Sequence, residues 1–521
     1  MTWPRPTPRA APRTSRSPAT TTWLARRPTW RPSRPIGTTS SSRPAHRHGH
    51  RIPGWGLSPP RFFRGTMMTI QDRPAVRVAF HTLGCRLNQY DTEGIKAALR
   101  LACDLEVVDW EDQADIYLLN SCTVTGKADQ ECRRLARQVK RRRPEARVVV
   151  AGCYAQTQSR SLAEVAEIDA VIGNTAKDTV DRWLFDVLDG PSGPADGTVV
   201  LVEEFGAATP LAAPLIEEFE GRSRAFVKVQ DGCDLRCAYC LIWQARGPAR
   251  SRTIEGVIDQ VGRLREAGGY HELILAGVHL GHWGRDLPGR PPLVDLVDAV
   301  ADAHPDLRLR LSSIHPSDIT PALLARVAER PQLRPHLHVS LQSGSDAVLR
   351  RMRRPYRRAT AERALSDAAA VDPQLGLGAD VIVGFPGETD AEFAETVDLV
   401  RRHPFTYLHV FRFSPRPGTP AAAMTPVHPE SVKERSGILR DLAREKRRAF
   451  LRSLAGQTRE AVIEDRDERD PARRLATTEN YATVTVDTEL PAGTLVTARI
   501  EVGTGDLPHA RVTDVLREVT P

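Results

Sequence analysis

The cysteine motif at residues 233–240 is the strongest chemical signal in this sequence. Cys233, Cys237 and Cys240 follow a C-x3-C-x2-C pattern directly after a short apolar run at 225–230. Three thiolates on one loop can hold three irons of a four-iron, four-sulfur cluster and leave the fourth iron open to a ligand. A structural zinc site usually has four closed ligands, often as two CxxC pairs. No second pair and no nearby histidine follow here, so the motif favours an iron–sulfur cluster over zinc.

Three more cysteines each end an apolar run. Cys85, Cys122 and Cys153 close the segments VRVAFHTLGC, IYLLNSC and RVVVAGC. Each segment is typical of a buried strand, and a helical segment follows each, which is the pattern of a parallel α/β sheet with ligands at the carboxyl ends of its strands. We therefore expect these three thiols to converge on one sheet edge. Cys103 and Cys132 match no motif and are interpreted as core or helix-face residues.

Three series of elements position these cysteines. Residues 76–190 predict a parallel, Rossmann-like α/β domain, and 191–222 predict a linker. Six strand candidates within 223–453, closed by a charged amphipathic helix at 429–453, predict a partial (βα)6 barrel with its chemistry at the strand C-terminal ends. Residues 454–519 alternate β-prone runs with turns and predict a small antiparallel β-barrel. The fold class is therefore α/β, with a β-barrel at the C-terminus.

The N-terminal residues 1–75 differ in composition from the rest of the chain. Residues 1–71 contain 13 Arg and no Lys, Asp or Glu, so removing them from the formal charge of +8 leaves −5 for the remainder. Such a Pro-, Arg- and Ser-rich segment cannot bury enough apolar surface to fold, and we predict disorder. It is a dispensable tail, a start assigned upstream of Met67 or Met68, or a transit peptide. Any RNA contact must then come from local basic patches.

The sequence resembles the radical S-adenosylmethionine enzymes and, within them, the methylthiotransferases, from about Val76 to Val515. The C-terminal barrel resembles the TRAM domain, a small RNA-binding module. The resemblance rests on eight segments: TLGCRLNQYDTEG (82–94), NSCTVTGKAD (120–129), AGCYAQ (151–156), DGCDLRCAYC (231–240), LAGVHLG (275–281), RLSSIHP (310–316), SLQSGSDAVLRRMRRPY (340–356) and DVIVGFPGET (380–389).

The resemblance implies two [4Fe-4S] clusters and S-adenosylmethionine as cofactors. Cys233, Cys237 and Cys240 would hold the radical-generating cluster, whose open iron binds S-adenosylmethionine. Cys85, Cys122 and Cys153 would hold an auxiliary cluster that carries the donated sulfur. Four residues fall at predicted strand ends where the family contacts S-adenosylmethionine, although a turn or strand cap would explain them equally: Gly277, Gln342, Ser343 and Asp380.

Three motifs resemble the branch that acts on tRNA. NSCTVT, GCYAQ and AGVHLG are similar to enzymes that convert N6-threonylcarbamoyladenosine, at position 37 of the anticodon loop, to its 2-methylthio derivative. The alternatives are isopentenyladenosine in tRNA, an aspartate of a ribosomal protein and, in another class, a non-catalytic RNA-binding, metal-sensing protein. The resemblance implies an electron donor protein, flavodoxin-like or ferredoxin-like, and a sulfur source. No apolar run is long enough to span a membrane, and we expect a cytoplasmic protein.

Two basic runs are candidates for phosphate contacts, with a solvated helix face as the alternative. Their residues are Arg141, Arg142, Arg143, Arg353 and Arg354. The sequence departs from the family pattern in two places. Trp243 and Gln244 follow the cysteine motif where a proline is usual, and His315 stands where an acidic residue is common.

Overall fold

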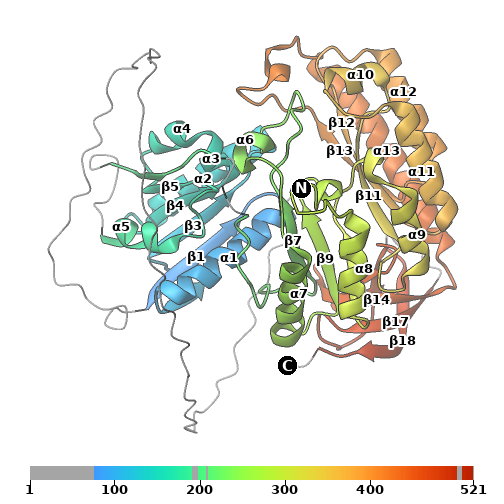
Figure 1. Cartoon of the computed structure of the whole chain (residues 1–521), viewed down its shortest axis with the longest axis horizontal. Helices are drawn as coiled ribbons and strands as arrows, with labels where there is room; N and C mark the ends of the chain where they lie inside the picture. Colours follow the sequence, from blue (N-terminus) through green and yellow to red (C-terminus); the bar gives the residue numbers. More distant parts are fainter. Residues whose placement is uncertain (1–74, 190–196, 207–208, 210, 502–506, 520–521) are drawn as a thin grey trace, which may run out of the picture. The chain divides into compact units, whose positions relative to one another are not determined.

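A six-stranded parallel sheet forms the N-terminal part of the described chain (Figure 1). The computed structural model describes residues 75–189, 197–206, 209, 211–501 and 507–519, all of which belong to one compact unit. The order in the sheet is β2-β1-β3-β4-β5-β6. The strands are β1 (Val76–Thr82), β2 (Leu105–Val108), β3 (Ile116–Ser121), β4 (Arg147–Gly152), β5 (Ala170–Ile172) and β6 (Val199–Leu201). The three predicted strands are β1, β3 and β4, and they are neighbours.

Helices cover both faces of this sheet. Successive strand residues point to opposite faces, so Val149 packs in one hydrophobic cluster while Val148 and Val150 pack in another. One cluster includes residues of α1, η2 and α5, and the other includes residues of α2, α3 and α4. The helices are α1 (Arg86–Ala102), α2 (Gly126–Arg142), α3 (Cys153–Thr157), α4 (Ser159–Ala163), η2 (Val180–Arg182) and α5 (Leu184–Asp189).

The central part of the chain forms an open parallel barrel. Its six parallel strands are β7 (Ala225–Asp231), β9 (Glu272–Gly277), β10 (Arg308–Leu311), β11 (His336–Gln342), β12 (Gly376–Val383) and β13 (Tyr407–Arg412). They form two sheets, β10-β9-β7-β8 and β11-β12-β13, and the bridges Leu309–Leu333 and Ile314–Val339 join them. The two-residue β8 (Arg250–Ser251) is antiparallel to β7. All six predicted strands are present.

Eight helices accompany the described strands of this part. They are α6 (Ile242–Arg246), α7 (Ile254–Gly268), α8 (Leu293–Ala303), α9 (Pro321–Glu329), α10 (Asp346–Arg351), α11 (Arg358–Val371), α12 (Asp390–Arg402) and α13 (Pro429–Ser453). Side chains cap the starts of α7, α9, α12 and α13, and Thr389 and Glu392 form a reciprocal capping box at α12. The predicted helix at 429–453 is α13.

The C-terminal strands close into a five-stranded barrel in the order β14-β15-β16-β18-β17. They are β14 (Thr458–Asp467), β15 (Asp470–Thr478), β16 (Thr483–Val486), β17 (Leu495–Ile500) and β18 (His509–Arg517). The prediction of a purely antiparallel barrel is corrected at one pair, because β16 and β18 run parallel. The first half of β15 is polar and exposed, so it lacks the alternation that identifies a half-buried strand.

Some predictions fall outside the described residues. The predicted leader, 1–75, lies there apart from Ala75, and so do 191–196, 207–208 and 210 of the predicted linker. In the described part of the chain, no helix combines the length and the apolar character needed to cross a membrane.

Candidate functional site

The three N-terminal motif cysteines lie at the carboxyl ends of neighbouring strands. Cys122 directly follows β3, Cys153 opens α3 directly after β4, and Cys85 precedes α1 in the loop after β1. Burial and the nearby thiolates of Cys85 and Cys153 raise the pKa of Cys122 to about 12. Gly84 permits this approach: it has a φ of +100°, and a Cβ on it would lie 2.6 Å from Cys122 Sγ.

This donor set fits a multinuclear cluster. All eight cysteines are free thiols. Three thiolates within electrostatic reach of one another repel unless a cation joins them. Among the described cysteines, no three place their sulfur atoms within 4.8 Å of one another, the spacing that a single metal ion needs. A cluster of several irons, bound by one thiolate per iron, suits this wider arrangement.

The barrel cysteines lie on the loop that follows β7. Burial raises the pKa of Cys240 to about 12 and that of Cys233 to about 11. The amide of Ile242 donates to Cys240 Sγ at 3.4 Å, and such bonds to sulfur tune cluster potentials. Gly232, with φ at +75°, opens the loop, and a Cβ there would lie 1.8 Å from Pro248 O.

The structure corrects one prediction about the basic runs. Arg354 is buried, and its guanidinium donates to Cys237 Sγ at 3.5 Å and to Ser340 O at 3.0 Å. It therefore belongs to the cysteine loop rather than to an RNA-binding surface. Arg141, Arg142 and Arg353 are exposed. Arg143 is partly buried and donates to Tyr117 Oη and Glu111 O.

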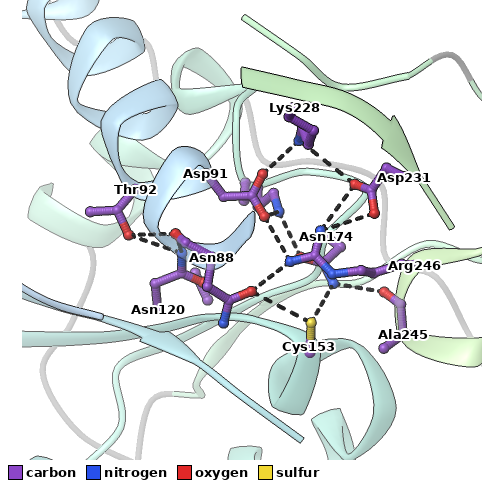
Figure 2. Close-up of polar contacts among 12 residues, drawn as sticks. Asn88, Asp91, Thr92, Asn120, Cys153, Asn174, Lys228, Asp231, Ala245 and Arg246 are labelled. Atoms are coloured by element: carbon purple, nitrogen blue, oxygen red, sulfur yellow. Dashed lines mark hydrogen bonds and ion pairs between the residues drawn. The ribbon is translucent and has the colours of Figure 1, made fainter. Parts of the chain in front are cut away.

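Five buried charged residues join α1, the segment after β5, β7 and α6 (Figure 2). Asp91 pairs with Lys177, with Lys228 at 2.6 Å and with Arg246 at 2.9 Å. Arg246 also contacts both oxygens of Asp231 at 3.0 Å. Burial alone would raise the pKa of Asp91, but the three cations outweigh it and hold that pKa well below its usual range. We call these five residues the buried charge cluster.

The buried charge cluster has three cations and two carboxylates, and the cysteines supply nearby negative charge. Burial alone would lower the pKa of Arg246, but Asp231, the thiolate of Cys153 and other nearby anions raise it well above its usual range. Asn174 donates to Cys153 Sγ at 3.4 Å and to Ala245 O at 2.7 Å. A buried charge is tolerated only when it is paired and hydrogen-bonded. The cluster therefore holds the first sheet against the loop region of the barrel.

Asn88 links the N-terminal cysteine loops to Arg246 (Figure 2). Its Nδ2 donates to Leu83 O at 2.8 Å and to Ser121 O at 2.9 Å, so it holds the loops before Cys85 and Cys122. Its Oδ1 accepts from Arg246 Nη2 at 2.5 Å and lies 3.8 Å from Cys153 Sγ. One amide thus contacts all three cysteine segments and the barrel.

Asn88 and Asp91 lie within the motif at 82–94, but no role for them was predicted from the sequence. The signal was present: both face the protein interior on α1, on the same side as Ile95 and Leu99. Polar residues three apart on the helix face that carries Ile95 and Leu99 indicate a buried network. Lys228, within an entirely buried strand, gave a similar signal.

The four residues predicted to contact S-adenosylmethionine occupy different settings. Gly277 and Gln342 end β9 and β11, and Gln342 has a φ of +63°. Ser343 is buried and its Oγ lies 3.2 Å from Thr396 Oγ1. Asp380 is not at a strand end, which corrects that expectation. It lies in the middle of β12, where it pairs with His338 at 3.0 Å and His409 at 3.2 Å.

Comparisons with known proteins agree with this architecture. The family model described as "Uncharacterized protein family UPF0004" matches residues 77–173, and the Radical SAM superfamily model matches residues 227–400. A solved structure of the radical S-adenosylmethionine methyltransferase TsrM from Kitasatospora setae aligns with a TM-score of 0.51 at 16% identity. It covers 67% of this chain and 77% of that one, a likeness of fold alone.

Several curated relatives match most of the chain. Threonylcarbamoyladenosine tRNA methylthiotransferase MtaB of Aquifex aeolicus (strain VF5) is 38% identical over 423 residues, which cover 81% of this chain and 99% of that protein. The protein of the same name from Rickettsia prowazekii (strain Madrid E) is 34% identical, and the match covers 83% of this chain and 97% of that protein. The tRNA-2-methylthio-N(6)-dimethylallyladenosine synthase of Sorangium cellulosum (strain So ce56) is 37% identical, over 75% and 82%.

The barrel, its cysteine loop and the superfamily match define a radical S-adenosylmethionine enzyme. Within that class, the chain belongs to the methylthiotransferase family, and it matches the Aquifex aeolicus and Rickettsia prowazekii members over 99% and 97% of their lengths. It is a transferase that uses S-adenosylmethionine and two [4Fe-4S] clusters.

Proposed function

We propose that this enzyme methylthiolates carbon 2 of N6-threonylcarbamoyladenosine at position 37 of tRNA. The observation that carries the proposal is the match to the Aquifex aeolicus relative, which is named for this substrate and is covered over 99% of its length. The local motifs NSCTVT, GCYAQ and AGVHLG support the same branch.

Each set of three cysteines has its own role in this proposal. Cys233, Cys237 and Cys240 hold the radical-generating cluster, and Cys85, Cys122 and Cys153 hold the auxiliary cluster. The position of both sets at strand carboxyl ends supports these assignments. Carbon 2 of adenine bears an unactivated C–H bond that no side-chain base removes usefully, and the bound clusters with S-adenosylmethionine supply the radical chemistry that this bond requires.

The protein's own contribution is to position the two cysteine sets. The buried charge cluster and Asn88 fix the N-terminal sheet to β7 and α6, the elements on either side of the barrel cysteine loop. A rigid link of this kind keeps two reacting centres at a constant separation, which removes an entropic cost from each turnover. Asn174 donates to Cys153 Sγ in the N-terminal set, and Arg354 donates to Cys237 Sγ in the barrel set.

We further propose how substrate and reductant reach the site. An adenosine in an anticodon loop is partly unstacked, so its extrusion costs less than from a duplex. The C-terminal barrel engages the RNA, and the exposed Arg141, Arg142 and Arg353 contact phosphates. A flavodoxin-like or ferredoxin-like protein supplies electrons, and a separate donor supplies sulfur.

A second candidate substrate is isopentenyladenosine in tRNA. The Sorangium cellulosum relative, which is named for dimethylallyladenosine, is 37% identical to this chain. Its identity is close to that of the Aquifex aeolicus relative, but the match covers 82% of its length against 99%, and the local motifs support the threonylcarbamoyl branch.

Mass spectrometry of tRNA nucleosides tests the proposal. We expect the 2-methylthio form of threonylcarbamoyladenosine to disappear when the gene is deleted and to return with the intact gene. A Cys237→Ala gene should not restore it, whereas the control Cys103→Ala, which changes a buried cysteine outside both sets, should restore it. Loss of a methylthio isopentenyl nucleoside instead would favour the second candidate, and unchanged nucleosides would exclude tRNA as the substrate.

A further inference from the structure

Three histidines and an aspartate gather where β9 and β10 end, and the proposed reaction assigns none of them a role. His279 precedes the short helix η3 (Leu280–His282), which ends at His282. His315 precedes the short helix η4 (Pro316–Asp318), which ends at Asp318. All three histidines are buried. Two segments 36 residues apart in the chain, counted from His279 to His315, therefore meet through four potential metal ligands.

The four side chains are in close contact. The ring of His279 stacks on that of His282 with centroids 3.4 Å apart, and lies 3.9 Å from that of His315. His279 Nε2 lies 2.8 Å from Asp318 Oδ2. The ligand atoms that His279, His282 and Asp318 can offer all lie within 4.8 Å of one another. Gly281 permits this approach, because a Cβ there would lie 2.4 Å from Asp318.

Each of the three rings carries a buried nitrogen with nothing to bind. Among the described residues, none is a hydrogen-bond partner for Nδ1 of His279, His282 or His315. A buried polar atom without a partner costs about 1–3 kcal/mol, and folded proteins contain few of them. Three such atoms on neighbouring rings therefore need an explanation, and a cation bound among His279, His282 and Asp318 offers one.

A second group of the same composition lacks this feature. His338, Asp380 and His409 also lie within metal-binding distance of one another. Asp380 Oδ1 contacts both rings, and His338 Nδ1 lies 2.9 Å from Tyr407 Oη. Among the described residues, His279 and His282 have buried ring nitrogens without a partner, whereas His338 and His409 have none.

We propose that His279, His282 and Asp318 bind one divalent transition-metal ion of the zinc type. Imidazole nitrogens with one carboxylate are a common donor set for such ions. The ion is additional to the two iron–sulfur clusters.

The position of this site gives the ion a structural role beside the radical-generating loop. The amide of His279 donates to Gln230 Oε1 at 2.9 Å. Gln230 Nε2 in turn donates to the carbonyls of Asp231 and Gly232, just before Cys233. An ion at this site therefore fixes the loops after β9 and β10 and, through Gln230, the start of the cysteine loop.

Metal analysis of the holoenzyme tests the proposal. The iron and sulfide contents of the protein are first measured to show that both clusters are complete. The protein is then incubated with Zn²⁺ and desalted, and its metals are analysed by mass spectrometry. Full clusters leave no cysteine of either set free to take zinc. The variants are His282→Ala and Asp318→Asn. The control is His304→Ala, which removes a half-buried histidine that also has an unpaired nitrogen but lies outside the four-residue group.

We expect about one Zn²⁺ per chain in the wild type and in His304→Ala. The apparent Kd for Zn²⁺ should rise by at least about tenfold in His282→Ala and in Asp318→Asn. Unchanged iron, sulfide and circular dichroism show that the variants are folded. The proposal is overturned if the folded wild type retains no zinc, or if the two site variants retain as much zinc as the control.

Discussion

The two cysteine sites differ in what brings their thiols together. Cys233, Cys237 and Cys240 lie within eight consecutive residues, so the conformation of one loop places them. Cys85, Cys122 and Cys153 span 69 residues and meet only because β1, β3 and β4 are neighbours in one parallel sheet. The first site depends on a short local segment, whereas the second depends on the whole domain and on its attachment to the barrel.

A buried arginine accompanies each site, and its partners show the same difference. Arg354 donates to Cys237 Sγ and to Ser340 O, both within the barrel. Arg246, from the barrel, contacts Asn88 and Asp91 of α1. Substitutions at the interface between the sheet and the barrel should therefore affect the N-terminal site more than the barrel site.

The largest expected effect separates the chemistry of the two sites. Cys237→Ala should abolish both reductive cleavage of S-adenosylmethionine and methylthio transfer. Cys122→Ala should abolish transfer but retain cleavage, because the barrel loop is complete without it. Each variant should keep about four irons per chain. The assays are 5′-deoxyadenosine formation, nucleoside mass spectrometry and iron content, and loss of cleavage in both variants would contradict independent sites.

The next largest effect concerns the buried charge cluster. Arg246→Met leaves Asp91 and Asp231 with fewer cationic partners in a buried site and should lower the free energy of unfolding by about 3–5 kcal/mol. The control Arg142→Met breaks an exposed pair with Glu111 and should cost less than about 1 kcal/mol. Urea unfolding measures both. Arg246→Met should also lose iron from the N-terminal site first, and equal losses from both sites would count against the comparison.

Acid should weaken the same interface. The pKa of Asp91 lies below its usual range in the folded protein, because three cations outweigh the effect of burial. A depressed carboxyl pKa contributes stability at neutral pH that is lost as the pH falls below the unfolded value of about 4. Below about pH 4, the free energy of unfolding should therefore fall more steeply in the wild type than in Asp91→Asn. The difference between the two slopes should be at most about 1.4 kcal/mol per pH unit.

Urea unfolding from pH 7 to pH 3 measures this difference. Protein freed of its clusters is used, so that the release of sulfide in acid does not contribute. Parallel profiles for the wild type and Asp91→Asn would show that Asp91 does not carry the effect.

The smallest expected effect concerns tuning at the barrel site. Arg354→Lys keeps the charge but removes the guanidinium geometry that donates to Cys237 Sγ. Because hydrogen bonds to sulfur favour the reduced cluster, the midpoint potential of the radical-generating cluster should fall by on the order of tens of millivolts. Redox titration followed by electron paramagnetic resonance measures this shift. The exposed neighbour Arg353, changed to Lys, should leave both potentials unchanged.

Strands with strong apolar runs were predictable, and polar or short ones were not. The sequence analysis placed β1, β3, β4 and the six barrel strands because each is a compact apolar run followed by a helical pattern. The strands that the sequence did not predict are β2, β5, β6 and β8, which have two to four residues each, and β15, whose first half is charged. Pairing with a neighbouring strand, which local sequence does not encode, creates these strands.

Some residues of the site were predicted correctly from the sequence and others were not, again because local sequence does not encode contacts between distant segments. The cysteines were identified from their spacing and position after strands. Arg354 was assigned to RNA because it stands in a basic run, yet the fold buries it against Cys237. Asp380 was expected at a strand end but lies within β12. A run of charges in the sequence does not reveal which member turns inward.

By itself, the sequence determined the α/β class, the two sets of cysteines and the family motifs, because these are properties of residue type, spacing and periodicity. Only the tertiary structure decided how Asn88, Asp91, Lys228 and Arg246 meet, and that His279, His282, His315 and Asp318 form one group. The physical reason is that buried charges and imidazoles acquire their partners from elements distant in the chain. Those partners exist only once the strands have paired.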